Sequence, residues 1–176
     1  MNAAEEFLER SRYYLSDEYL PKLRQCVDAL PDGAIWRRAN ESSNSIGNLL
    51  LHLAGNVRQW IVGGIGQEDV ERNRAAEFSA RGGTSGAELI ENLGNAVAEA
   101  DAVLARLTSD DLDRPCVIQE RETRVLEAIY HVVEHFAMHT GQIVLLTKSY
   151  SPDTIHFYDD STPAARPVWG GTERIR

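Results

Sequence analysis

Apolar side chains recur at every third or fourth residue along four long segments of this chain, and this spacing constrains the fold most. The clearest segment lies between Ser85 and Leu107, where the apolar positions are Leu89, Leu93, Val97, Ala100, Leu104 and Leu107. A helix with this spacing has one apolar face that other helices must cover. The alternation of apolar and polar residues that is typical of strands is missing, so we expect an all-α protein.

The four helices are expected at about residues 3–30, 44–62, 86–107 and 123–150. Ser43 or Asn44 is the expected N-cap of the second helix, and Gly63-Gly64 is expected to end it. Ser85 and Glu88 have the spacing of a capping box before the third helix. Four helices of this length favour a four-helix bundle.

The segments between these helices are expected to be irregular. Residues 67–83 are polar and rich in arginine and glycine, which indicates an exposed loop. We expect Arg72, Arg74 and Arg81 to be solvated there, and contact with an anionic substrate is the alternative. Residues 108–122 form a second break, with a short β-prone run after a proline.

The length of 176 residues is sufficient for one domain with a substantial core. We find no internal repeat and no linker, so residues 1–176 are expected to form a single helical-bundle domain. Residues 151–176 are expected to be an irregular tail whose apolar side chains pack on the bundle.

The bulk properties indicate a cytoplasmic protein. A net charge of −9 argues against a nucleic-acid partner, because phosphate binding needs a basic face. The start of the sequence does not have the pattern of a signal peptide, and no stretch approaches the roughly 18 apolar residues that span a membrane. Cys26 and Cys116 match no metal-binding spacing, and we expect both to be reduced thiols.

Three of the five histidines lie one helical turn apart in the fourth predicted helix, at His131, His135 and His139. Spacing of four residues puts imidazoles on one face of a helix. A helix turns by about 100° per residue, so each side chain of the fourth helix has an angular position around its axis. With His135 set at 0°, the apolar stripe is centred near 100°, His139 lies at about 40° and His131 lies at about −40°. We therefore expect His139 to be the deepest and His131 to lie nearest to solvent. Glu134 is expected to be a solvated or interhelical charge.

A fourth histidine, His52, lies on the margin of the apolar stripe of the second helix. Its polar neighbours on the helix are Ser45, Asn48 and Asn56, and hydrogen bonds from them are expected to fix the tautomer of the imidazole. An imidazole from a second helix would complete a three-histidine metal site with an open coordination position. The alternative is that the histidines are ordinary surface or hydrogen-bonded residues.

His52, together with the run His135-x-x-x-His139-Thr140-Gly141-Gln142, resembles the DinB/YfiT-like superfamily, over about residues 5–150. The resemblance implies a four-helix bundle of up-down-down-up type, often a homodimer. It also implies a divalent transition metal, commonly zinc or nickel with iron possible, held by His52, His135 and His139. His131 would line the cavity, support the ligands or have no role.

Characterised members of this superfamily include metal-dependent enzymes that use low-molecular-weight thiols. The resemblance therefore implies a thiol S-transferase-like enzyme, whose partners are a low-molecular-weight thiol and a small electrophilic substrate. Metal-bound water would instead make the protein a metal-dependent hydrolase. A third hypothesis is a non-enzymatic metal-binding protein that acts in stress response or interaction. The sequence assigns no catalytic residue.

Overall fold

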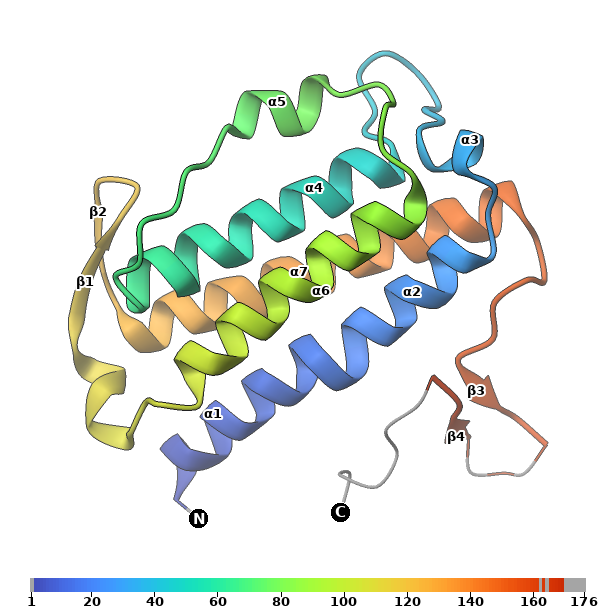
Figure 1. The fold of residues 1–176 in the computed structure, drawn as a ribbon. Helices are drawn as coiled ribbons and strands as arrows, with labels where there is room; N and C mark the ends of the chain where they lie inside the picture. Colours follow the sequence, from blue (N-terminus) through green and yellow to red (C-terminus); the bar gives the residue numbers. More distant parts are fainter. Residues whose placement is uncertain (1, 162, 164, 170–176) are drawn as a thin grey trace.

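Four long helical segments lie side by side in the computed structural model, which describes residues 2–161, 163 and 165–169 (Figure 1). The helix α4 packs on α6, α6 on α2, α2 on α7, and α7 on α4, so the four close around one core. In Figure 1 the first segment runs in one direction, α4 and α6 run in the opposite direction, and α7 returns. The predicted all-α fold is confirmed.

The first helical segment consists of α1 (Ala3–Tyr13), the π-helical turn η1 (Tyr14–Tyr19) and α2 (Leu20–Asp28). This agrees with the prediction, except that the sequence pattern did not indicate the π-helical turn. Pro21 lies at the start of α2 and lacks the N–H that a regular helix would use there. The π-helical turn η1 ends two residues before Pro21.

The second segment consists of α4 (Ile46–Val57) and the π-helical turn η2 (Arg58–Ile65). The predicted N-cap was wrong: Ser45 caps the helix, by accepting a hydrogen bond from the backbone N–H of Asn48. The predicted end at Gly63-Gly64 was also wrong. A Cβ at Gly64 would lie 2.5 Å from the side chain of Ile118, so Gly64 serves close packing rather than helix termination.

The third segment is α6 (Gly86–Leu104), and the predicted capping box of Ser85 and Glu88 is present. The break after it contains the 3-10 helix η3 (Ser109–Asp113) and an antiparallel hairpin of β1 (Pro115–Ile118) and β2 (Arg121–Arg124). The fourth segment is α7 (Val125–Tyr150). It begins two residues later than predicted, because Thr123 and Arg124 belong to β2.

The segment 67–83 differs from the prediction of an exposed loop. It contains the helix α5 (Arg74–Ser79), which packs on α4 (Figure 1). Arg74 and Arg81 are exposed as predicted, but the side chain of Arg72 is only 6 % exposed. A short helix, α3 (Asp32–Ile35), was also not predicted.

Residues 151–161, 163 and 165–169 of the tail include two short strands, β3 (Tyr158–Asp159) and β4 (Arg166–Pro167), which pair with each other. Ile155 and Trp169 are buried, and the ring of Trp169 lies 3.8 Å from Nζ of Lys22 on α2. The remaining positions of the predicted tail lie outside the described residues.

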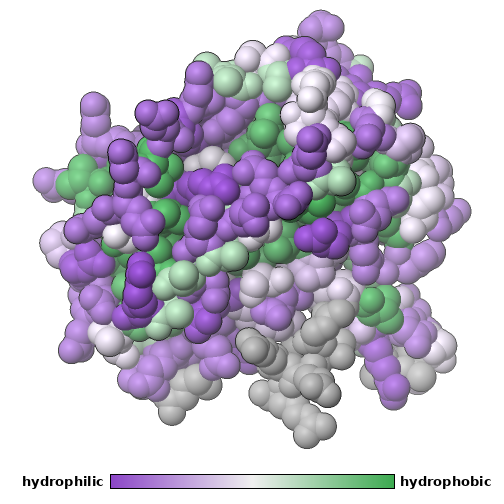
Figure 2. Space-filling view, in the orientation of Figure 1, coloured by the Kyte–Doolittle hydropathy of each residue, from purple (hydrophilic) through white to green (hydrophobic). Residues whose placement is uncertain are grey.

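The core is made by the apolar faces of the four helical segments, and its largest fully buried side chains include Leu15, Leu23, Leu50, Leu53, Ile61, Leu93 and Phe136. Figure 2 shows one face of the molecule, on which hydrophilic residues surround smaller hydrophobic areas. Within the described part of the chain, no helix combines the length and apolar character needed to cross a membrane.

Candidate metal centre

Three histidines from two neighbouring helices converge between α4 and α7. Nε2 of His135 lies 3.1 Å from Nε2 of His52 and 3.2 Å from Nε2 of His139. One ring nitrogen from each residue lies within 4.8 Å of the other two. His52 is 5 % and His139 is 9 % exposed, and His135 is half-buried. The structure thus brings together the three residues that the sequence indicated.

The helix geometry explains this convergence. His135 and His139 lie one turn apart on α7, so their rings project from one face toward α4. His139 is the most buried of the three histidines on α7, as the angular positions predicted. His131 stays outside the trio: its ring lies 4.2 Å from the ring of Trp60, centroid to centroid. Glu134 is exposed, as predicted.

A buried ion pair from segment 67–83 orients His52. Nδ1 of His52 lies 2.9 Å from Oε2 of Glu77. Arg72 donates to both oxygens of the same carboxylate, from Nε at 2.7 Å and from Nη2 at 2.9 Å. Burial raises the pKa of Glu77, but the hydrogen bonds from Arg72 and His52 outweigh burial and hold this pKa below its ordinary value. Glu77 is therefore a carboxylate at neutral pH.

The carboxylate fixes the tautomer of His52. A carboxylate can only accept hydrogen bonds, so Nδ1 of His52 must carry the proton. The lone pair then remains on Nε2, which faces the other two histidines. Nη2 of Arg72 also lies 3.1 Å from Nδ1 of His52, but both atoms are donors and both point at Glu77, so this contact is no hydrogen bond.

The prediction that polar neighbours on α4 fix the tautomer of His52 was wrong: among the described residues, Oδ1 of Asn56 is buried without a hydrogen-bond partner, and Asn48 and Ser45 have other roles. Nδ2 of Asn48 donates to the backbone oxygens of Glu77 at 2.8 Å and of Ala80 at 2.9 Å, which ties α5 to α4. Ser45 caps α4. The sequence pattern did not indicate Arg72 and Glu77 as partners of the site, because their segment has no apolar periodicity that would place it.

Gly55 allows the ion pair to approach α4 closely. A Cβ at this position would meet Oε1 of Glu77 in a severe overlap and would lie 2.8 Å from Nε of Arg72. Any side chain at position 55 would therefore displace the carboxylate that holds His52.

His139 and His135 also direct their Nε2 atoms toward Nε2 of His52. Nδ1 of His139 lies 2.8 Å from Oε1 of Gln142, one turn further along α7, so its Nε2 also faces the trio without a proton. Nε2 of His135 contacts both of these lone pairs, and one proton could satisfy only one of them. Among the described residues, Nδ1 of His135 is buried without a hydrogen-bond partner.

This donor set fits a divalent transition metal. Tetrahedral zinc with Zn–N bonds of about 2.0–2.1 Å separates two nitrogen ligands by about 3.3 Å. The two Nε2 separations of 3.1 and 3.2 Å are close to that value. Two of the three rings also have an acceptor for the Nδ1 proton, as metal-bound imidazoles commonly do.

His135 and His139 are held neutral, as metal ligands must be. Burial, together with the nearby histidines and Arg72, lowers the pKa of His135 to about 3. Burial also lowers the pKa of His139, against a hydrogen bond to Gln142 that raises it. At pH 7 both rings therefore present lone pairs rather than charges.

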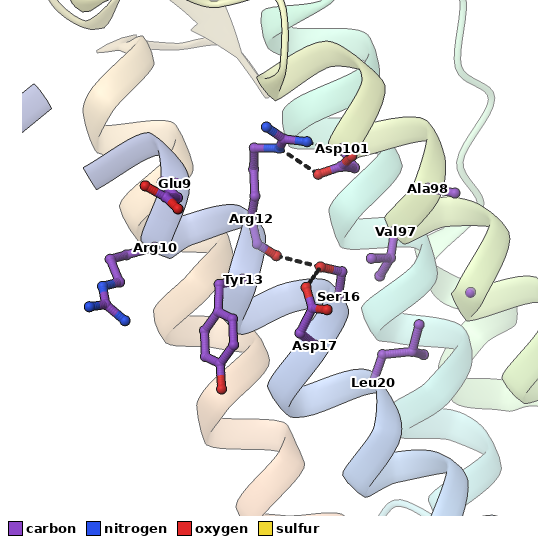
Figure 3. Close-up of a pocket in the computed structure, with 11 residues that line it drawn as sticks. Glu9, Arg10, Arg12, Tyr13, Ser16, Asp17, Leu20, Val97, Ala98 and Asp101 are labelled. Atoms are coloured by element: carbon purple, nitrogen blue, oxygen red, sulfur yellow. Dashed lines mark hydrogen bonds and ion pairs between the residues drawn. The ribbon is translucent and has the colours of Figure 1, made fainter. Parts of the chain in front are cut away.

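Two cavities among the described residues are not lined by the trio. A groove of about 410 Å³ lies between the first helical segment and α6, where Arg12 and Asp101 form an ion pair of 2.6 Å (Figure 3). A smaller cavity of about 250 Å³ adjoins Arg72 and Glu77. Neither is lined by the three histidines, so the histidine cluster itself marks the candidate site.

Comparisons with known proteins agree with this fold. The family described as "Protein of unknown function (DUF1572)" matches residues 2–157. The crystal structure of a DinB-like protein from Bacillus cereus has a TM-score of 0.68 and 18 % identity, over 88 % of this chain and 97 % of that chain. At this identity the likeness shows the fold alone, and no curated protein matches the chain. Because the family match spans most of the sequence, the chain belongs to the DUF1572 family, and its fold is that of the DinB-like protein.

Proposed function

We propose that the chain is a metal-dependent enzyme of the thiol S-transferase type, built on a divalent metal held by His52, His135 and His139. The observation that carries the proposal is the convergence of three imidazole nitrogens, two of them with their Nδ1 protons already accepted. Three protein ligands leave a coordination position for a reactant. A divalent metal bound there supplies a Lewis acid, which favours the thiolate form of a thiol at neutral pH.

The two cysteines of the chain support an external thiol as nucleophile. Cys26 is fully buried, and burial raises its pKa to about 11. Burial also raises the pKa of Cys116. A protonated thiol is a poor nucleophile, so neither side chain is suited to attack a substrate at neutral pH.

The carboxylates around the trio favour transfer over hydrolysis. A hydrolase of this type needs a general base that is free to take a proton from water. Both oxygens of Glu77 already accept hydrogen bonds from Arg72 and His52. Glu134, the acidic residue next to His135 in sequence, is exposed. Neither side chain is placed as a free base.

Zinc and nickel are the metals that we propose first, with iron as a further possibility, because neutral imidazoles suit all three. The resemblance described above also leads us to propose a homodimer in the cytoplasm that acts on a small electrophile. The molar mass in solution tests the dimer directly.

The activity is tested with metal-loaded protein, a low-molecular-weight thiol and an activated aryl halide. The new S–C bond forms as the carbon–halogen bond breaks, and the thiol proton passes to the buffer. Loss of thiol and release of halide should both depend on metal. Both should vanish in His135→Ala and persist in His131→Ala, the matched control one turn away.

Two other outcomes would contradict a transferase. Turnover of an ester without thiol would show a hydrolase. Full metal loading without turnover of either probe would favour a non-enzymatic metal-binding protein.

A further inference from the structure

We propose that Glu77, held by Arg72, is a positioning residue that sets the metal affinity of the centre by fixing the tautomer of His52. This inference rests on the proposed metal site and adds two residues that influence its affinity for metal. Segment 67–83 supplies this residue, so the closure of the segment on α4 and the binding of metal favour each other.

The choice of tautomer decides whether His52 can bind a metal. A neutral imidazole carries its proton on either ring nitrogen. With the proton on Nε2, the N–H bond of His52 would point at Nε2 of His135, only 3.1 Å away, and would block coordination. With the proton on Nδ1, Glu77 accepts it and the Nε2 lone pair is free. The carboxylate thus selects the form that binds metal.

Stability alone does not explain the placement of this ion pair. The side chains of Arg72 and Glu77 are 6 % and 10 % exposed. Removing two charges from water costs about as much as their attraction returns, so a buried ion pair adds little net stability. A residue outside the pair also fixes the position of Arg72: its Nη1 donates a hydrogen bond to Oε1 of Gln59, on the second helical segment, at 2.7 Å. These contacts orient the carboxylate toward His52.

Glu77 is a stronger anchor than its counterpart on α7. Gln142 accepts a hydrogen bond from Nδ1 of His139 through a neutral amide oxygen, and Gln142 is an exposed residue. A hydrogen bond to a charged group is about twice as strong as one between neutral groups. Of the two Nδ1 acceptors, Glu77 therefore has the larger influence on the site.

The test compares zinc affinity, measured by competition with a chromophoric chelator, in wild type and two variants. Glu77→Gln keeps the shape but replaces one of the two accepting oxygens by an N–H₂ group, so zinc binding should weaken by about 10- to 100-fold. Gly55→Ala leaves all polar groups intact but displaces the carboxylate, and should also weaken binding. Thermal unfolding of the metal-free proteins shows that each variant is folded.

Two controls match these variants. Glu71→Gln removes an exposed carboxylate from the same segment. Gly63→Ala adds a methyl group on the same helical segment, where the nearest atom lies at an ordinary 3.5 Å. Both should bind zinc within about twofold of wild type, since neither contacts the ligands of the proposed metal.

A second readout separates this inference from the proposed function. NMR of the imidazole nitrogens in metal-free protein should show His52 protonated on Nδ1 in wild type and on Nε2 to a substantial extent in Glu77→Gln. If wild type binds neither zinc nor nickel, the proposed function fails, and the NMR result still decides the role of Glu77. Unchanged affinity and an unchanged tautomer in Glu77→Gln would overturn the inference. If that variant does not fold, unchanged affinity in Gly55→Ala would do so.

Discussion

Mild acid should destabilise the metal-free protein through His135. Its pKa is lowered to about 3, first by burial and then by neighbouring histidines, whereas the unfolded chain has the ordinary value of 6.5. Between these two values the unfolded state binds a proton that the folded state does not. The contribution to stability is therefore complete above about pH 6.5 and is lost as the pH falls toward 3.

The size of the effect follows from the two pKa values. Between pH 7 and pH 5, one such histidine costs about 2 kcal/mol of unfolding free energy. His139 acts in the same direction, because burial lowers its pKa too. The carboxylate of Glu77 acts only at lower pH, below the ordinary pKa of 4.5, because its pKa is lowered from that value. The loss between pH 7 and pH 5 thus reports on the histidines.

Urea unfolding of chelator-treated protein at pH 7 and pH 5 measures this loss. His135→Gln removes the group, so its loss of stability should be smaller than that of wild type by about 2 kcal/mol. His156→Gln changes an exposed histidine of the tail and should behave as wild type. An equal loss of stability in His135→Gln and wild type would refute the view that His135 is held neutral by burial.

Three further predictions follow from the same contacts. Zinc should slow cleavage by trypsin at the exposed Arg74 and Arg81, because metal and closure of segment 67–83 favour each other; equal cleavage rates with and without zinc would contradict this coupling. Asn48→Ala removes two hydrogen bonds that hold α5, and should lower the free energy of unfolding in urea by about 1–3 kcal/mol. A maleimide should modify the half-buried Cys116 much faster than the fully buried Cys26, as followed by mass spectrometry of native protein; similar rates would show that the core opens readily.

The helical elements could be predicted from the sequence because their signals are local. The spacing of Leu89, Leu93 and Val97 defines a buried face by itself, and Ser85 with Glu88 defines the start of α6 within four residues. The end of the second helix was mispredicted because Gly63-Gly64 has the local pattern of a stop. In the structure, Gly64 instead allows the side chain of Ile118 to pack closely against the helix. Ile118 lies far from Gly64 in the sequence, so a local pattern could not indicate this contact.

The same distinction between local and non-local signals applies to the candidate site. His135 and His139 share a face by helix periodicity, and a place on the margin of an apolar stripe among polar residues indicated that His52 is the third ligand. Glu77 and Arg72 could not be found in this way. Their segment has no apolar face, and its place over α4 depends on the absence of a side chain at Gly55.

The metal content of untagged protein tests the central claim most directly. After loading with zinc or nickel and removal of free metal, wild type and His131→Ala should each hold about one ion per chain. His52→Ala, His135→Ala and His139→Ala should each lose most of it, because two imidazoles bind far more weakly than three. A wild type without metal, or variants that keep it, would contradict the assignment of His52, His135 and His139 as the ligands.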